Sequence, residues 1–222
     1  TWVGLLPGSR LPEIENHLPG MLAAARSLQA QHPDSGAIMR EYEFLVPLAP
    51  TLDTPQQAAV TRIVDDHSAG LTVRLVRDAR AALFHARASV VASGTATVEA
   101  ALIGNPFIVV YRVSPLTYAI AKRVVKVPHV AMANLIAGKR VVPELIQQDF
   151  TAANIVQQLN RLLPDGPVRE SMRLELGVIR DALRTNPDGN GDVPASAIER
   201  VARIVLGIVQ SASPAAVGAV HT

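Results

Sequence analysis

Apolar residues in the first 133 positions follow two alternating patterns, short continuous runs and longer segments with helical spacing. The runs, which predict strands, lie at 1–6, 44–48, 71–76, 88–92, 107–111 and 127–131, although Arg74 and His129 interrupt two of them. The segments between them repeat apolar residues at helical intervals, as at Ile14, Leu18 and Leu22, which is typical of helices packed on a core. Strands and helices in alternation, joined by short links, predict right-handed βαβ units. We therefore expect an α/β fold with a doubly wound, mostly parallel Rossmann-like sheet.

The pattern changes at Thr151, after which only helical spacing remains. We expect residues 1–150 to form the Rossmann-like domain and residues 151–210 to form C-terminal helices that pack on it. Residues 211–222 are small and contain a proline, which predicts a flexible tail. The chain opens without Met and within an apparent strand, so we expect a fragment or an excised domain.

Composition narrows the possible classes of protein. Hydrophobic residues make up 49% and charged residues 18% of the 222 positions, which is enough apolar material for a large core. The chain has no cysteine, which excludes disulfides, thiolate metal sites and a cysteine nucleophile. A net charge of +2 gives no reason to expect nucleic acid as a partner. No apolar run approaches the roughly 18 to 20 residues that span a bilayer.

A first candidate for phosphate binding follows the first predicted strand, where Pro7 leads through Gly8, Ser9 and Arg10 into a helix. Ligands of doubly wound sheets bind beyond the carboxyl ends of the strands. Gly8 permits close backbone approach, a helix N-terminus favours an anion, and Arg10 offers a planar cation that suits a diphosphate. The alternative is an ordinary turn with a surface arginine. The loop has neither the Walker lysine nor the dinucleotide fingerprint.

A second candidate follows the fourth predicted strand, where Ser93, Gly94 and Thr95 form a turn into a helix. Glu99 lies four residues after Thr95 and therefore on the same helix face. Because helical side chains tilt toward the N-terminus, its carboxylate points back at the turn, where it could accept both hydroxyls of a ribose. The alternative is that Glu99 only interacts favourably with the helix dipole.

Five segments in this order resemble the lipid-A-disaccharide synthase family, over about residues 3–183. They are the segments at 5–14, 92–99, 111–112, 134–138 and 142–147. Members of this family are similar to other GT-B glycosyltransferases, in which two Rossmann-like domains face each other across a cleft. The resemblance implies that this chain is the C-terminal, UDP-sugar-binding domain, and that an N-terminal acceptor domain is absent from it.

The resemblance also implies roles for individual residues. Gly8, Ser9 and Arg10 would bind the phosphates together with Ser93, Gly94 and Thr95, and Glu99 would hold the ribose. Asn134 and Gly138 would lie in a loop that faces the donor sugar, with Glu144 close by. The sequence departs from the family at Ala133, where a proline is usual, and in a longer segment at 35–42.

The implied reaction transfers 2,3-diacylglucosamine from its UDP donor to 2,3-diacylglucosamine 1-phosphate, with inversion and release of UDP. We expect no cofactor and no metal, since helix N-termini and Arg10 would stabilise the leaving diphosphate. The general base is expected on the N-terminal domain. The acylated substrates imply a cytoplasmic protein in peripheral contact with the inner membrane of a Gram-negative-type bacterium. A basic amphipathic helix at 115–125 could make that contact or simply pack on the sheet.

Two other functions fit the same two loops. Another UDP-sugar enzyme of GT-B architecture, such as a 2-epimerase or an N-acetylglucosaminyltransferase, would keep the phosphate and ribose sites but bind other sugars. A non-catalytic nucleotide-binding module would keep the sites without any transfer chemistry.

Overall fold

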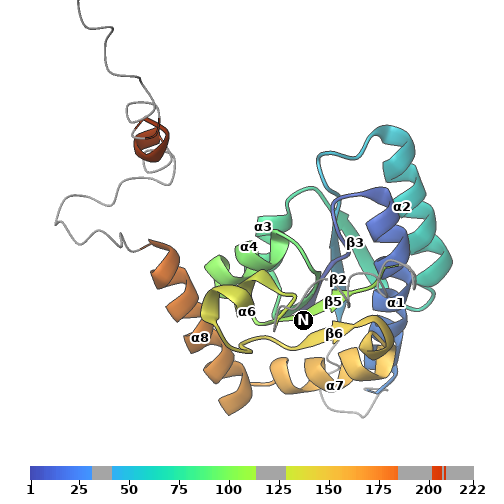
Figure 1. The fold of residues 1–222 in the computed structure, drawn as a ribbon. Coiled ribbons are helices and arrows are strands. Elements are labelled where there is room, and N and C mark those ends of the chain that lie inside the picture. Colours follow the sequence, from blue (N-terminus) through green and yellow to red (C-terminus); the bar gives the residue numbers. More distant parts are fainter. Residues whose placement is uncertain (32–41, 114–128, 185–201, 207, 209–222) are drawn as a thin grey trace, which may run out of the picture. The chain divides into compact units, whose positions relative to one another are not determined.

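A computed structural model describes residues 1–31, 42–113, 129–184, 202–206 and 208 (Figure 1). The chain divides into two compact units, Thr1–Arg180 and Asp181–Thr222, and the whole sheet belongs to the first. The helix expected at 115–125 and the long segment at 35–41 lie outside the described residues.

Six strands form one sheet in the order β3-β2-β1-β4-β5-β6, and every neighbouring pair is parallel. This confirms the doubly wound α/β fold. The strand order reverses between β1 and β4, which therefore lie side by side at the centre, with Leu5 opposite Val90. The central strands are buried almost throughout because helices cover both faces, which explains their continuous apolar runs. The strands are β1 (Trp2–Leu6), β2 (Glu43–Pro47), β3 (Thr72–Val76), β4 (Ala88–Ala92), β5 (Phe107–Tyr111) and β6 (Glu144–Ile146).

The sixth strand differs from the prediction. Residues 129–131, the described part of the segment expected at 127–131, form a bend, and the strand beside β5 is Glu144–Ile146. This edge strand is only three residues long and starts with a charged residue, so its apolar content is too small to produce a run.

Helices cover the two faces of the sheet in separate groups (Figure 1). Helix α1 packs between α2 and α7 on one face, and α4 packs between α3 and α6 on the other. Several helices begin at side-chain caps, for example Asp53, which forms a capping box with Gln56. The helices are α1 (Leu11–Ala30), α2 (Thr54–His67), α3 (Ala79–His85), α4 (Ala96–Ile103), α6 (Met132–Ala137), α7 (Ala152–Leu162) and α8 (Pro167–Arg184), with a 3-10 turn at Gln147–Asp149.

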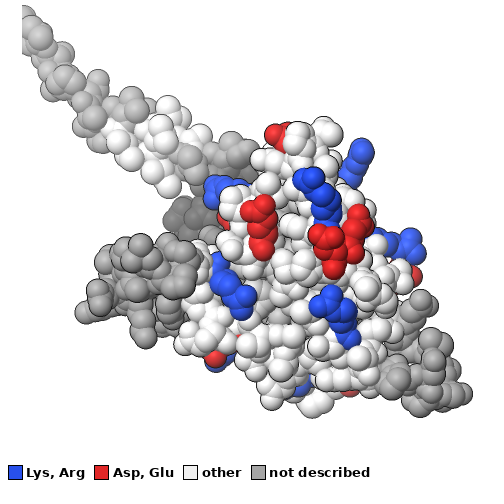
Figure 2. All heavy atoms as spheres, turned by 90° about the vertical axis from the view of Figure 1, so that its right-hand side faces the viewer, with Lys and Arg blue, Asp and Glu red and all other residues white. Residues whose placement is uncertain are grey.

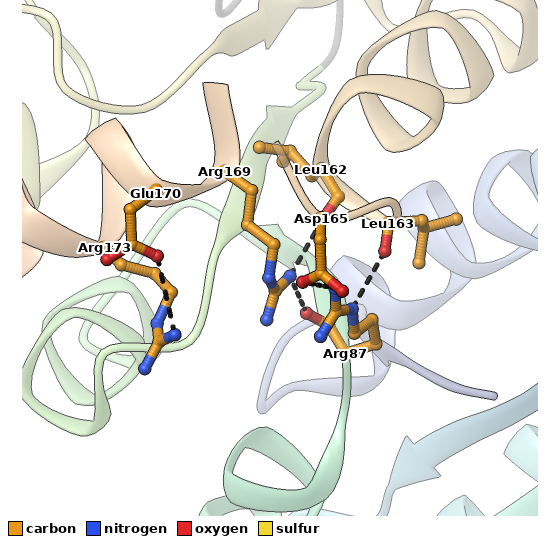
Figure 3. Close-up of polar contacts among 7 residues, drawn as sticks. All are labelled: Arg87, Leu162, Leu163, Asp165, Arg169, Glu170 and Arg173. Atoms are coloured by element: carbon orange, nitrogen blue, oxygen red, sulfur yellow. Dashed lines mark hydrogen bonds and ion pairs between the residues drawn. The ribbon is translucent and has the colours of Figure 1, made fainter. Parts of the chain in front are cut away.

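Two arginines attach the end of α7 to the start of β4 (Figure 3). Arg169, nearly buried, donates from Nη1 to the carbonyl oxygens of Leu162 at 2.9 Å and Arg87 at 2.6 Å. Arg87 donates from Nε to the carbonyl oxygen of Leu163 at 2.9 Å and pairs with Asp165. Since the last carbonyls of a helix have no partner within it, these guanidinium groups both satisfy them and complement the helix dipole.

Candidate functional site

The two predicted loops lie side by side because the strands that carry them are neighbours. Loop 7–10 follows β1 and loop 93–95 follows β4, so both emerge at the carboxyl edge of the sheet where the strand order reverses. In open α/β sheets this crevice is the usual place for a ligand. Both loops line one pocket of about 480 Å³, which also receives residues from the ends of β2 and β3. All seven residues predicted for nucleotide binding line it, namely Gly8, Ser9, Arg10, Ser93, Gly94, Thr95 and Glu99.

The first loop depends on a glycine. Gly8 has φ +128°, and an added Cβ would lie 2.7 Å from the Cβ of Glu13 and 2.6 Å from its Oε2. Glu13 can therefore fold back over the loop, where its Oε2 accepts from the backbone N–H of Ser9 at 3.0 Å. Its Oε1 lies 3.4 Å from Nη1 of Arg10, whose side chain is 81% exposed. A carboxylate thus already occupies the N–H donor and the cation that would bind a phosphate.

The second loop leaves polar groups facing the pocket. Thr95 is the N-cap residue of α4 but makes no capping hydrogen bond through its side chain. Thr97 points inward instead. Its hydroxyl donates to the carbonyl oxygen of Gly94 at 2.7 Å and so stabilises the turn. Ser93 donates to the carbonyl oxygen of Val130 at 3.3 Å and so connects the pocket to the segment before α6.

Glu99 lies one turn into α4, as the helical spacing predicted, and its Oε1 is 3.4 Å from Nη2 of Arg80. Both side chains are partly exposed, as are Arg10 and Glu13. Exposed ion pairs of this kind contribute about 0 to 1 kcal/mol each, so either pair can exchange its partner for a ligand at little cost. Arg77 adds another cation to the pocket wall.

A buried histidine that the sequence did not single out supports the first loop. His17 on α1 lies 2.9 Å through Nδ1 from the carbonyl oxygen of Pro7, and its Nε2 accepts from the backbone N–H of Arg112 at 3.1 Å. An accepting Nε2 requires the proton on Nδ1, so the ring is neutral and ties the end of β1 to the end of β5. Burial lowers the pKa of His17, against opposing effects from the Pro7 carbonyl and Glu13. The sequence carried no local signal for this role, because His17 acts through backbone groups of two other segments.

Residues 132–144 are arranged differently from the expected loop. Asn134 lies in helix α6, fully buried, and Gly138 is the left-handed C-cap of that helix. Oδ1 of Asn134 accepts from the N–H groups of Val141 at 2.8 Å and Val142 at 2.9 Å, and its Nδ2 donates to Glu144 at 2.9 Å. None of Asn134, Gly138 and Glu144 lines the pocket between the two loops.

Another hollow, of about 700 Å³, lies away from both loops, between the segment before β6 and helices α7 and α8. It contains Lys139, which pairs with Glu175 at 2.8 Å, and the exposed Arg140 and Arg161. It holds none of the predicted phosphate or ribose residues, so its greater volume does not make it the better candidate.

The described residues offer neither a metal site nor a membrane-spanning helix. Within the described ranges, no group of three His, Cys, Asp or Glu side chains could hold a metal ion. No helix among those same residues is long and apolar enough to cross a bilayer. On the face drawn in Figure 2, basic and acidic side chains are interspersed among a majority of uncharged ones. That face therefore has no continuous basic surface of the kind that nucleic acid requires.

The strand order, with its reversal between β1 and β4, and the helices on both faces of the sheet define an α/β domain of Rossmann type. A solved structure with this fold is the pneumococcal O-GlcNAc transferase GtfA in complex with UDP and GlcNAc. It is 16% identical, with a TM-score of 0.51 over 94% of this chain and 35% of the other. The lipid-A-disaccharide synthetase family model matches residues 1–185, and the chain belongs to this family.

Named relatives agree with the family match. A lipid-A-disaccharide synthase of Acidobacterium capsulatum is 53% identical over 94% of this chain and 50% of its own length. That of Koribacter versatilis is 41% identical over the same shares. The chain thus spans about half the length of the curated relatives that it matches.

Proposed function

We propose that this chain binds the UDP-sugar donor in the synthesis of the lipid A disaccharide. The whole protein would transfer 2,3-diacylglucosamine from UDP to 2,3-diacylglucosamine 1-phosphate. The observation that carries the proposal is the convergence of both predicted loops on one pocket at the reversal of strand order. The two loops come from distant parts of the sequence, and each combines a glycine, a hydroxyl and a helix start, which together suit a diphosphate.

Each group in the pocket has a proposed task. Arg10 pairs with phosphate oxygens through its planar guanidinium, helped by backbone N–H groups of loops 7–10 and 93–95. Glu13 then gives up Arg10 and the N–H of Ser9 to the phosphate. Glu99 turns from Arg80, which is a long 3.4 Å contact in the structure, to the ribose hydroxyls. Arg80 remains beside it as a counter-ion.

In the proposed transfer, an acceptor hydroxyl oxygen attacks the anomeric carbon while the bond from that carbon to the diphosphate oxygen breaks. The hydroxyl proton passes to a base that we place outside this chain. The negative charge that develops on UDP is stabilised here by Arg10 and the helix N-termini, so we propose that no metal is needed. Peripheral contact with a membrane is part of the same proposal, because both substrates carry acyl chains.

Isothermal calorimetry on the chain with UDP tests the donor site. Arg10→Lys keeps the charge but loses bidentate pairing, so UDP affinity should fall about tenfold or more, equivalent to about 1.4 kcal/mol. Glu99→Ala should weaken UDP by about ten- to a hundredfold and 2′-deoxy-UDP much less. EDTA should change neither affinity.

Arg62→Lys, on the exposed surface of α2, is the matched control and should leave binding unchanged. The proposal fails if the unaltered chain does not bind UDP, or if Arg10→Lys and Arg62→Lys behave alike. Equal losses of UDP and 2′-deoxy-UDP in Glu99→Ala would exclude the ribose role.

A further inference from the structure

Helix α6 has an inverted distribution of side chains. The large apolar residues Met132, Leu135 and Ile136 are 40%, 44% and 40% exposed, whereas Ala133 and the polar Asn134 are fully buried. Val130, just before the helix, is 38% exposed. A surface helix normally buries its large apolar residues and exposes its polar ones. Clustered exposure of this kind marks a binding surface more often than an ordinary exterior.

The exposed face is held in place by its buried side. The Glu144 carboxylate accepts from the N–H groups of Val130 and Ala131 at 3.1 and 2.8 Å, and also from the amide of Asn134. Asn134 in turn binds the backbone at Val142 through both of its side-chain polar atoms. Residues 130–137 are therefore anchored through backbone groups. Met132, Leu135 and Ile136 are exposed because the segment is fixed in this orientation, not because it is frayed.

The apolar face is continuous with the nucleotide pocket. Ser93, in the pocket wall, donates to the carbonyl oxygen of Val130 at 3.3 Å, and α6 packs against α4, which starts at the same loop. No charged side chain occurs at 130–137. A ligand whose diphosphate lies in the polar pocket could thus extend from Ser93 directly onto an uncharged apolar surface.

We propose that Val130, Met132, Leu135 and Ile136 form an acyl-contact face that receives a fatty acyl chain of the sugar donor. This inference rests on the proposed function, because it extends the same donor site. In the proposed function the uridine and diphosphate fill the pocket between the two loops, whereas α6 offers a neighbouring surface of large exposed apolar side chains. Asn134 and Glu144 are positioning residues for this face, which explains why buried polar groups lie beneath exposed apolar ones.

Calorimetry on the chain at one fixed detergent concentration compares three ligands. They are UDP, UDP-N-acetylglucosamine, which adds a sugar, and UDP-2,3-diacylglucosamine, whose sugar carries fatty acyl chains. The diacylated donor should bind more tightly than UDP-N-acetylglucosamine, which has no fatty acyl chain. We call this ratio of affinities the acyl advantage. In the double variant Leu135→Ser with Ile136→Ser, this acyl advantage should fall at least about tenfold, as expected for loss of a few apolar contacts. Affinity for UDP should stay unchanged, which also shows that the variant is folded.

Leu174→Ser is the matched control, since Leu174 is an equally large residue that is 65% exposed on α8. It should keep the full acyl advantage, and the single variant Met132→Gln should lose part of it. If the double variant keeps the full acyl advantage, the proposed acyl-contact face is refuted. This holds even if that variant loses binding to anionic vesicles. Failure of the unaltered chain to bind UDP would refute the proposed function itself, which is a different result.

Discussion

The buried amide of Asn134 offers a strong test of how the segment beneath the acyl-contact face is stabilised. Replacement by leucine keeps a side chain of similar size but removes every hydrogen bond. In the structure Oδ1 accepts from Val141 and Val142, and Nδ2 donates to the carbonyl oxygen of Val142 at 2.9 Å and to Glu144. Asn134→Leu should therefore leave the backbone polar groups of residues 141–142 without partners.

The cost follows from how many of those groups are buried. Val142 is fully buried, so its N–H and C=O cannot turn to water, whereas Val141 is partly exposed and its N–H can be hydrated. An unsatisfied buried group costs about 1 to 3 kcal/mol, and two such groups predict a loss of about 2 to 6 kcal/mol in the free energy of unfolding.

Urea denaturation followed by circular dichroism measures the loss. The control is Asn160→Leu, because the Asn160 amide is exposed and, among the described residues, donates to the side chain of the exposed Gln31 at 2.9 Å. Its substitution should change stability by less than about 0.5 kcal/mol. UDP affinity should be unchanged in Asn134→Leu under native conditions, since Asn134 does not line the nucleotide pocket. A loss below about 1 kcal/mol would refute the idea that this amide holds the segment together.

Two further predictions concern buried cationic or titratable groups. Burial lowers the pKa of His17 from 6.5, so its neutral form favours the folded state. Its contribution to stability should be complete above about pH 6.5 and should fall as the pH drops toward the lowered value. The free energy of unfolding, measured by urea denaturation between pH 7.5 and 5, should therefore depend less steeply on pH in His17→Gln than in the unaltered chain. An equal pH dependence would contradict this prediction. Arg169→Met should cost about 2 to 6 kcal/mol by leaving two carbonyls unpaired. Thermal denaturation should show almost no effect for Arg173→Met, since Arg173 is exposed and its ion pair within the described part of the chain is the exposed contact with Glu170. Equal shifts would refute a special role for Arg169.

Local patterns predicted most of the sheet because parallel strands that are covered on both faces must be continuously apolar. Five of the six strands lie where the sequence predicted them; β4 is buried at every position, whereas the edge strand β3 includes Thr72 and Arg74 and is only partly buried. The exception, β6, is paired with β5 through only three residues and begins with Glu144, which is needed to bind the N–H groups at 130–131. Its position depends on a tertiary contact, which cannot be predicted from the pattern of neighbouring residues.

The two loops of the candidate site could also be predicted one at a time, from a glycine and hydroxyls between a strand and a helix. Their convergence could not, because it depends on the strand order, which places β1 beside β4 although more than eighty residues separate them along the chain. The same long-range placement brings Arg80 to Glu99 and brings the backbone of Arg112 to His17. These supporting residues gave no local signal, since each acts through a neighbour on another element.

Helix α6 shows why the remainder of the site resists sequence-based prediction. Periodicity assigns large apolar residues to the core, and by that rule Leu135 and Ile136 should be buried and Asn134 exposed. The structure has the opposite arrangement. The buried amide of Asn134 forms hydrogen bonds with backbone groups of residues 141–142, which would otherwise have no partner. Natural proteins depart from such local rules mainly at functional sites. The departure occurs next to Ser93, at the edge of the pocket between the two loops, where the proposed acylated donor would need an apolar surface.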